Sequence, residues 1–271
     1  MASPRRSLLH AGRRGRRSCT GLPAWFGHLL HALDAACLVG AQSLWALRRR
    51  PRPLAPAWSR GVWMTDRLRK VRRIYDHDPD AYHRAMSSRF TEWMLGGRRR
   101  KVGETVRGLV LDVGFGTGLS VPYYPADVHV VGIDVSSKML EVGRRFARSS
   151  GRNADVLVMD AEHLALPDHV FDSVAFNLCL CTIPNPEAAI REGVRVAKPG
   201  APMVFLEHVR SHLLPVALLE EAVNPAMVAL QADHMNRRTA DFVRRSGVEV
   251  LSIDRWFAGM FNLIVGRAQS G

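Results

Sequence analysis

Short apolar runs alternate with stretches of helical periodicity from residue 108 onward. The apolar runs predict strands at 108–113, 128–133, 154–159, 171–178, 202–208, 248–254 and 260–267. The helical stretches predict helices at 136–149, 186–197, 214–230 and 237–246. Alternation of this kind is typical of βαβ units, in which helices cover both faces of a mostly parallel sheet. The pattern therefore predicts an α/β fold with a seven-stranded sheet.

The two ends of this predicted fold differ from its middle. The last two strands are joined by only a few residues around Ala258-Gly259, which is a hairpin length, so we expect the last strand to run antiparallel. Residues 67–100 have a helical pattern with one break near Asp78-Pro79. We expect a helical cap over residues 64–104, a main domain over 105–271 and a lid at about 209–236.

The net charge of +13 is concentrated at one end of the chain. Residues 1–63 contain eleven arginines, no lysine and one acidic residue, which gives this arm a net charge of +10. Residues 64–271 carry a net charge of only +3. The body of the chain therefore lacks the basic bias of a nucleic-acid-binding domain, and we expect no nucleic-acid partner.

The arm, residues 1–63, contains a mostly apolar segment at 21–47. The polar residues of that segment fall near one helical face, so a helix lying on a membrane surface fits better than a membrane span. An Arg-rich and acid-poor N-terminus is also typical of a transit peptide, which would direct the protein to the mitochondrion. A further alternative is that the arm is not native, because the chain from Met64 contains every motif described below.

The four cysteines are Cys19, Cys37, Cys179 and Cys181. Their spacing fits neither a disulfide framework nor a zinc or redox motif, so we expect a reducing, cytoplasmic environment and no metal site. Cys179 and Cys181 lie two residues apart in an apolar run. We expect both to share one strand face and to pack near the bound ligand.

The clearest motif is the glycine-rich segment that follows the apolar run Leu109–Val113. It reads Gly114-Phe115-Gly116-Thr117-Gly118 and leads toward a predicted helix. Glycine permits positive φ and lets the backbone approach a ligand closely. A dinucleotide fingerprint has its third glycine where this chain has Leu119, so the spacing disfavours a nicotinamide-dependent oxidoreductase.

The next two predicted strands each end in an acidic residue. Asp134 follows Gly114 by twenty residues, and a carboxylate at this place can accept two hydrogen bonds from a ribose diol. Asp160 ends the third strand. Because the carboxyl ends of parallel strands form the ligand crevice of an open α/β sheet, we expect these groups to share one site.

These motifs occur in order with Asp160-Ala161-Glu162, Phe171-Asp172 and Lys198-Pro199-Gly200. Over about residues 70–267 the chain thereby resembles the class I S-adenosylmethionine-dependent methyltransferases. The resemblance implies a Rossmann-like fold and S-adenosylmethionine as the cofactor. It also implies roles for single residues in binding this cofactor. Asp112, Gly114, Gly116 and Gly118 would border its methionine half, and Asn177 would line the same methionine side. Asp134 would hold its ribose, and Asp160 with Ala161 would face its adenine.

Within this class, residues 160–172 resemble the ubiquinone/menaquinone C-methyltransferase group. Residues 181–184 and 206–211 are more similar to a bacterial branch related to phospholipid N-methyltransferases and animal thiol methyltransferases. The chain departs from that branch at Ala226 and Ala232, where a large residue or a glycine is common. The resemblance implies a small apolar molecule, a lipid or quinone head group, or a thiol as the methyl acceptor.

Three residues are candidates for acting on the acceptor, which needs a base only if it must lose a proton. His208 ends the fifth strand and could be that base, or it could be a structural histidine that hydrogen-bonds a loop. His234 could reach the crevice from the lid, or it could lie at a solvated helix terminus. Tyr75 could cap the pocket from the N-terminal helices, or it could be a core aromatic.

The basic run 98–101 is expected to be a solvated helix end, although it could bind a phosphate head group. The sequence thus predicts a methyltransferase. The alternative is a non-catalytic cofactor-binding or assembly protein on the same fold.

Overall fold

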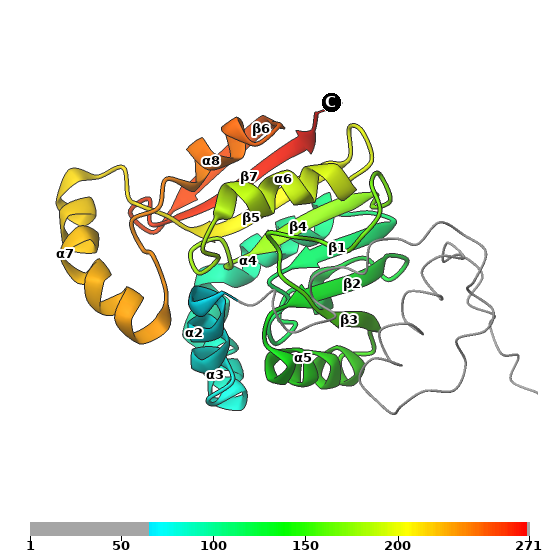
Figure 1. The fold of residues 1–271 in the computed structure, drawn as a ribbon, viewed down its shortest axis with the longest axis horizontal. Coiled ribbons are helices and arrows are strands. Elements are labelled where there is room, and N and C mark those ends of the chain that lie inside the picture. The colour runs from blue at the N-terminus through cyan, green and yellow to red at the C-terminus, as the bar shows by residue number, and fades with distance from the viewer. Residues whose placement is uncertain (1–64, 270–271) are drawn as a thin grey trace, which may run out of the picture. The chain divides into compact units, whose positions relative to one another are not determined.

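A seven-stranded sheet forms the centre of the computed structural model, which describes residues 65–269 (Figure 1). The strand order is β3-β2-β1-β4-β5-β7-β6. The strands are β1 (Leu109–Val113), β2 (His129–Asp134), β3 (Ala154–Val158), β4 (Ser173–Asn177), β5 (Pro202–His208), β6 (Val248–Trp256) and β7 (Phe261–Ala268). Every boundary lies within two residues of the prediction, and the α/β fold class is confirmed.

The direction of the strands changes at one side of the sheet. Strands β1 to β5 pair in parallel, whereas β7 pairs antiparallel with both β5 and β6. The predicted antiparallel last strand is therefore confirmed. The hairpin between β6 and β7 turns through Phe257 and Ala258, which both have positive φ.

The helices are α2 (Asp66–Tyr75), α3 (Pro79–Met86), α4 (Arg89–Thr105), α5 (Ser137–Ser149), α6 (Pro186–Val196), α7 (Leu214–Gln231) and α8 (Thr239–Arg245), with a short 3-10 helix, η2 (Val121–Tyr123). The predicted break near Asp78-Pro79 is present, and Asp78 caps α3 by accepting the N–H of Ala81. A second break, which the periodicity did not indicate, comes at Ser87-Ser88. Ser88 caps α4 by accepting the N–H of Thr91.

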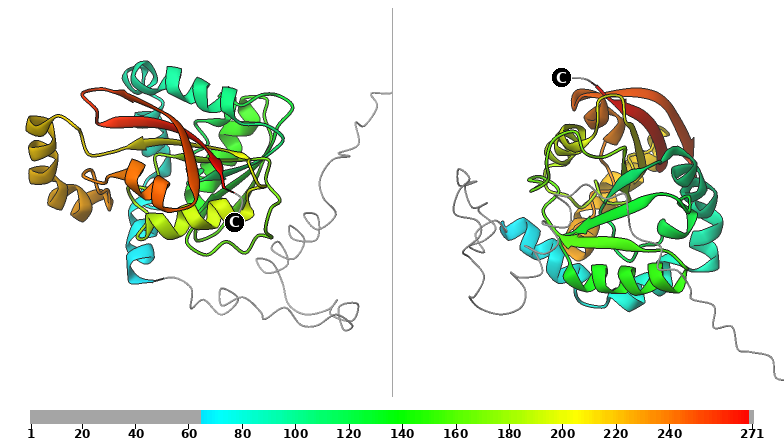
Figure 2. Two further views of the ribbon diagram at one scale, coloured as in Figure 1. Left: turned by 90° about the horizontal axis from the view of Figure 1, so that it is seen from above. Right: turned by 90° about the vertical axis from the view of Figure 1, so that its right-hand side faces the viewer.

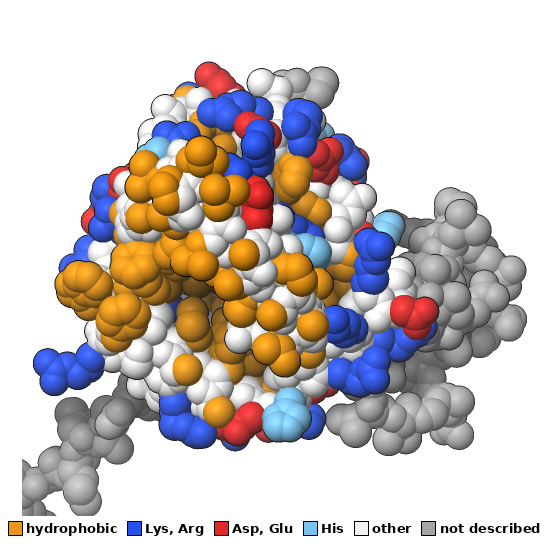
Figure 3. All heavy atoms as spheres, turned by 90° about the vertical axis from the view of Figure 1, so that its left-hand side faces the viewer, with side chains coloured by type: hydrophobic (Ala, Val, Ile, Leu, Met, Phe, Trp, Pro, Cys, Tyr) orange, Lys and Arg blue, Asp and Glu red, His pale blue; other side chains and the backbone are white. Residues whose placement is uncertain are grey.

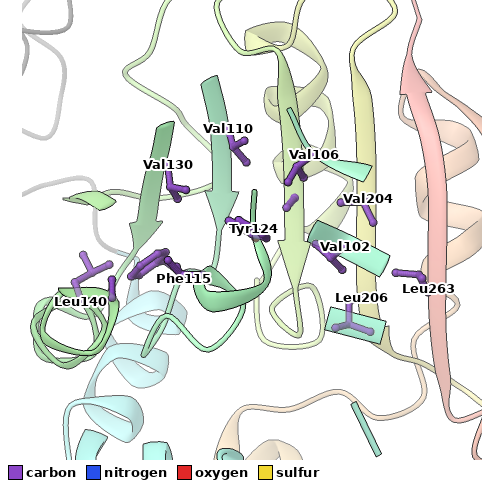
Figure 4. Packing of buried hydrophobic residues seen from close by; sticks show 13 residues of the cluster. Val102, Val106, Val110, Phe115, Tyr124, Val130, Leu140, Val204, Leu206 and Leu263 are labelled. Carbon is purple, nitrogen blue, oxygen red and sulfur yellow. The ribbon is translucent and has the colours of Figure 1, made fainter. Parts of the chain in front are cut away.

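Helices cover both faces of the sheet. Figure 2 shows α4 on one side of the sheet and α6 with α8 on the other. On the first side, α4, η2 and α5 enclose the main hydrophobic cluster (Figure 4). Val102 of α4, Leu140 of α5 and Phe115 of the glycine-rich turn contact strand residues such as Val110 and Val204 there. This packing fixes the turn that follows β1 against the sheet.

Helix α7 differs from the other helices because it exposes most of its apolar side chains. Leu214, Leu219 and Leu230 are each more than 60% exposed, and only Ala217 and Glu220 of this helix are buried. In Figure 1, α7 lies at the edge of the molecule, away from the sheet. Of the helices between residues 65 and 269, none combines the length and apolar character that crossing a membrane needs. The segment 21–47 lies outside the described residues.

The expectation that the two central cysteines share a strand face is wrong. Strand β4 ends at Asn177, and Leu178 then takes a positive φ of 53°, so the chain leaves the sheet before Cys179 and Cys181. Both cysteines lie in the following turn, buried and unbridged. Cys19 and Cys37 lie outside the described residues.

Candidate active site

The carboxyl ends of β1, β2, β3 and β4 lie around one cavity of about 680 Å³, part of which is open to solvent. It is lined by the strand ends and by α2 and α3, with Gly114, Gly116, Asp134, Asp160, Ala161, Asn177, Tyr75 and Tyr82 among the lining residues. The fold thus brings together the glycine-rich turn and the acids of the next two strands, as expected.

The glycine-rich turn needs glycine for two different reasons. Gly114 has φ +68°, and a Cβ there would lie 2.2 Å from the Cβ of Cys179, so the turn and the segment after β4 approach each other closely. Gly118 has φ +73° and lines neither this cavity nor the next one described. A Cβ on it would press on the Phe115 ring and on the carbonyl of Gly143 in α5. Gly118 therefore serves the packing of the turn against α5.

Asp134 is the carboxylate best placed to bind hydroxyl groups. Its Oδ1 accepts the N–H of Ser136 at 2.9 Å, and its Oδ2 accepts the N–H of Gly116 at 3.0 Å. Because a carboxylate has about four lone-pair sites, both oxygens keep acceptor capacity toward the cavity. Burial raises the pKa of Asp134 to about 6, against the opposing effect of the backbone N–H groups. These two hydrogen bonds fix the carboxylate before a ligand binds.

Asp160 and Ala161 lie at the next strand end along the cavity wall. Asp160 is buried, and its Oδ1 accepts the N–H of Glu162 at 2.9 Å. Its Oδ2 lies 3.1 Å from Nδ1 of His163. As with Asp134, neighbouring residues orient the carboxylate, so its position follows from local sequence.

A second, smaller cavity of about 430 Å³ shares Tyr82, Gly114, Gly116, Asn177 and Leu178 with the first. Asp112, which is 1% exposed, lines it and accepts hydrogen bonds from the Tyr124 hydroxyl at 2.8 Å and from Nδ2 of Asn177 at 2.9 Å. Burial raises the pKa of Asp112 to about 6. Oδ1 of Asn177 is buried and has no hydrogen-bond partner among the described residues. It can therefore accept a hydrogen bond from a ligand.

Two tyrosines from the N-terminal helices close the first cavity. Tyr75 of α2 and Tyr82 of α3 both line it, and their rings meet edge to face at 5.7 Å. Burial raises the pKa of both hydroxyls above the ordinary value, so both stay protonated at neutral pH. The structure thus places Tyr75 where the cap was expected.

Glu207 holds the turn after β4, a role that the sequence did not reveal. Its side chain is fully buried and accepts the N–H of Cys179 at 3.2 Å and the N–H of Leu180 at 3.1 Å. Burial raises the pKa of Glu207 to about 8. An acidic residue inside an apolar strand such as β5 is the one signal of this role that the sequence carries, because a buried carboxylate needs partners.

The two candidate histidines lie next to the cavity walls and not in them. His208 packs edge to face on Phe261 at 5.0 Å, and burial lowers its pKa although Asp233 and Glu220 raise it. Its Nδ1 is buried without a partner among the described residues, as is Oδ1 of Asp233. His234 donates its backbone N–H to the carbonyl of Cys181 at 3.0 Å, and burial lowers the pKa of its ring. Their catalytic roles stay predictions.

The lid segment is fixed over the turn that follows β4. Arg237 donates to the carbonyl oxygens of Leu180 and Ile183, the latter at 2.6 Å. Between residues 65 and 269, no cluster of side chains has the composition of a metal site.

The expected cofactor, S-adenosylmethionine, fits these walls. Asp134 has free acceptor capacity for a ribose diol, and Asp160 with Ala161 lies one strand further along. The buried and unpartnered Oδ1 of Asn177 supplies a hydrogen-bond acceptor where β4 meets the cavity.

Comparison with known proteins agrees with this geometry. Residues 111–205 match the family model described as a methyltransferase domain. Over this segment the chain is similar to methyltransferase domains. Over 118 residues, or 43% of the chain, it is 37% identical to the phosphatidylethanolamine N-methyltransferase of Cereibacter sphaeroides. Over 116 residues, or 41% of the chain, it is 34% identical to the ubiquinone/menaquinone biosynthesis C-methyltransferase UbiE of Vibrio cholerae.

These alignments span about half of the curated relatives, 58% of the first protein and 45% of the second. Among solved structures, the chain resembles the cyclase SpnF in fold, with a TM-score of 0.62, 19% identity, and coverage of 75% of this chain and 97% of the other. It also resembles geranyl diphosphate methyltransferase in complex with GPP and sinefungin, with a TM-score of 0.58, 13% identity, and coverage of 75% and 98%. At these identities the likeness concerns the fold.

Proposed function

We propose that this protein is an S-adenosylmethionine-dependent methyltransferase whose acceptor is a small apolar molecule, a lipid or quinone head group, or a thiol. The observation that carries the proposal is the cavity at the ends of β1 to β4, where Asp134 and Asp160 are held by backbone N–H groups. The relatives named for phosphatidylethanolamine and for ubiquinone and menaquinone support an acceptor of this kind.

The residues of the chain contribute mainly by positioning. The cofactor supplies an activated methyl group, so orienting the acceptor accounts for much of the rate enhancement. Asp134 and Asp160 orient the adenosine, and Tyr75 with Tyr82 excludes water from the same cavity. Burial lowers the pKa of His208, and its buried Nδ1 has no partner among the described residues, so this ring is the candidate base for an acceptor that must lose a proton.

The surface around the lid supports an apolar acceptor. Figure 3 shows hydrophobic side chains gathered on the face of the molecule that carries α7. Leu213, Leu218 and Phe257 are exposed, as are the leucines described above. We infer that these side chains contact the apolar part of the acceptor or the surface in which it is dispersed, and that the basic arm assists this contact.

The first test is a calorimetric titration of S-adenosylmethionine into the full chain. We expect micromolar binding, weakened tenfold or more by Asp134→Asn, a loss of about 1.4 kcal/mol. Asp127→Asn is the matched control, because Asp127 is exposed and precedes β2 at the opposite end of the strand. A folded wild-type protein that does not bind the cofactor would contradict the proposal.

A second measurement separates the enzyme from a non-catalytic binding protein on the same fold. Labelled cofactor is incubated with phosphatidylethanolamine vesicles, a demethylmenaquinol and an alkyl thiol, and the label in each product is counted. If the wild type methylates one of these acceptors and Asp134→Asn does not, the result supports the proposal that the protein is an enzyme. Cofactor binding without transfer to any of the three favours the binding protein.

A further inference from the structure

Helix α4 exposes two large aromatic side chains near its start. Phe90 is 61% exposed and Trp93 is 74% exposed, and their rings lie 5.9 Å apart. The opposite face of the helix is buried and includes Arg99, so the expectation that the run 98–101 is solvated is wrong at this residue. Aromatic side chains gain much free energy from burial, so two that lie side by side in solvent indicate a surface for contact with a partner.

This aromatic pair lies at the carboxyl edge of the sheet, which also carries the larger cavity. Helix α4 leads into β1 through a short loop, so the last turn of α4 lies at the amino edge and its first turns at the carboxyl edge. Strand β6 also ends at the carboxyl edge, because β7 is antiparallel to both β5 and β6. The Arg98 guanidinium lies 4.6 Å from the centre of the Trp256 ring at the end of β6. The aromatic pair lies one to two helical turns beyond this contact, toward the same edge.

The hairpin between β6 and β7 and the start of α7 reach this edge as well. Phe257, which is 42% exposed, lies in the hairpin turn. The hydroxyl of Ser211 donates to the carbonyl oxygen of Ala258 at 2.6 Å and accepts the N–H of Leu213 at 3.0 Å, so the turn is fixed beside the start of α7. Figure 2 shows the start of α4, this hairpin and α7 toward the same end of the sheet. We call their exposed residues the apolar edge: Phe90, Trp93, Leu213 and Phe257.

The charges next to the apolar edge leave basic groups in excess. Glu92, Glu221 and Asp254 lie near it, and each forms an ion pair with an arginine. Arg89 and Arg255 flank it, are exposed, and have no acidic partner among residues 65–269. Figure 3 shows lysine and arginine side chains around the border of the hydrophobic area on the face that carries α7. Unpaired positive charge around an apolar surface is complementary to an anionic one.

We propose that the apolar edge docks on an anionic phospholipid bilayer, with Phe90 and Trp93 among the head groups and Arg89 and Arg255 on the lipid phosphates. Tryptophan suits a membrane–water interface because its ring is apolar and its N–H is a donor. The guanidinium group of arginine binds phosphate well. Docking of this edge brings the larger cavity next to the lipid. The inference goes beyond the proposed function, because the docking needs no cofactor.

The test sediments the full chain with vesicles of phosphatidylcholine, with and without phosphatidylglycerol. We expect the wild type to bind the vesicles that contain phosphatidylglycerol at least tenfold more tightly. Phe90→Ala together with Trp93→Ala should weaken this binding tenfold or more, which is about 1.4 kcal/mol. Leu251→Ala is the matched control and should bind as the wild type does, because Leu251 is 49% exposed in the middle of β6, away from the edge.

A second pair of substitutions tests the charges. Arg89→Gln together with Arg255→Gln should weaken binding to the phosphatidylglycerol vesicles about tenfold and leave binding to pure phosphatidylcholine within about twofold. Added salt should weaken the wild type in the same way, because it screens exposed charges. Arg107→Gln is the control, since Arg107 is exposed and precedes β1 at the opposite edge of the sheet.

Several outcomes would overturn the proposal. If the aromatic double variant binds the phosphatidylglycerol vesicles as tightly as the wild type, another part of the chain holds the membrane. Failure of the wild type to bind either kind of vesicle, or equal binding to both, would overturn docking on an anionic bilayer. Sedimentation velocity without vesicles covers a further case: a dimer that the double variant dissociates would assign the edge to a second copy of the chain.

Folding and the proposed function are checked on the same preparations. Both aromatic side chains are exposed, so the circular dichroism of the double variant should match that of the wild type. Calorimetry should show unchanged binding of S-adenosylmethionine, because neither residue lines a cavity described above. Loss of vesicle binding with intact cofactor binding supports the docking surface. Loss of both in the double variant would show that the substitutions disturb the fold, and would overturn a role confined to the surface.

Discussion

Two sides of the site differ in the hydrogen bonds of their polar atoms: the cofactor side, which contains Asp134 and Asp160, and the lid side, which contains His208, Glu220 and Asp233. On the cofactor side, each oxygen of Asp134 accepts one backbone N–H group. Oδ1 of Asp160 also accepts a backbone N–H group, and its Oδ2 lies 3.1 Å from Nδ1 of His163. On the lid side, Nδ1 of His208, Oε1 of Glu220 and Oδ1 of Asp233 are all buried without a partner among residues 65–269. The carboxylates of the cofactor side are thus oriented before a ligand binds, although Oδ1 of Asn177 is unpartnered there too, whereas on the lid side the ring of His208 and the carboxyl of Asp233 each keep a buried atom without a partner.

The same contrast appears in the apolar residues. Strand β5 buries its side chains almost completely, whereas α7 exposes most of its leucines. Burying apolar surface is the main favourable term in folding, so the body of the domain is stable without the exposed face of α7. We infer that the acceptor supplies the missing contacts on the lid side, and the following predictions test this difference.

The largest expected effect is on the glycine-rich turn. Gly114→Ala puts a Cβ 2.2 Å from that of Cys179 on a residue with φ +68°, so we expect a loss of roughly 2–5 kcal/mol from left-handed strain and overpacking together. Gly151→Ala is the control, because its φ of +71° is similar but a Cβ there meets no described atom within 4 Å. Denaturant unfolding should show the control losing only about 1–2 kcal/mol. Equal losses would contradict the close approach.

A smaller effect, confined to the chemical step, is expected at His208. For an acceptor that must lose a proton, His208→Asn should lower kcat about a hundredfold, the lower end of general-base contributions. The dissociation constant of the cofactor should stay within twofold, because His208 lines neither cavity. Activity assays and calorimetry on the same preparation measure both. An unchanged kcat with an acceptor such as an amine would assign His208 a structural role.

The cofactor side could be predicted from the sequence because its geometry is local. Asp134 is oriented by the N–H of Ser136, two residues away, and by the turn that packs next to it. Each strand end therefore carries its own functional residue, and the strand pattern alone places Asp112, Asp134 and Asp160 at one edge of the sheet. For the same reason the strand boundaries were predicted to within two residues.

The remaining features depend on contacts distant in sequence. Glu207 binds backbone groups 27 and 28 residues away, and Arg99 faces a cavity formed by the turn after β1 and the end of β4. Periodicity indicates which face of an element is buried, but not what that face meets. The charged side chain of Arg99 on a buried face of α4 is the signal that could have found it.

The cofactor side should also respond to pH. Burial raises the pKa of Asp112 and Asp134 from 3.8 to about 6, so their contribution to the stability of the free protein is full below pH 3.8 and is lost as pH rises through 6. We expect cofactor binding to have the opposite sign, because an ionised carboxylate is the stronger acceptor for the hydroxyl and amino groups of the cofactor. We expect affinity to fall about tenfold between about pH 7.5 and pH 5. Asp112→Asn should flatten this dependence, and a pH-independent affinity of the wild type would show that neither carboxylate binds the cofactor.

The smallest expected effect is at the exposed face of α7. Leu219, which is 64% exposed, should tolerate Leu219→Ala with a change in unfolding free energy below about 0.5 kcal/mol. Leu206, which is 1% exposed in β5, should lose about 2–5 kcal/mol in Leu206→Ala. Denaturant unfolding of both variants measures the difference. If Leu219→Ala instead costs as much as a core substitution, α7 is covered in solution, and its leucines are not available to an acceptor. If it costs almost nothing, the apolar face of α7 has no role in folding, and its leucines are available for contact with an acceptor or with the surface in which the acceptor is dispersed.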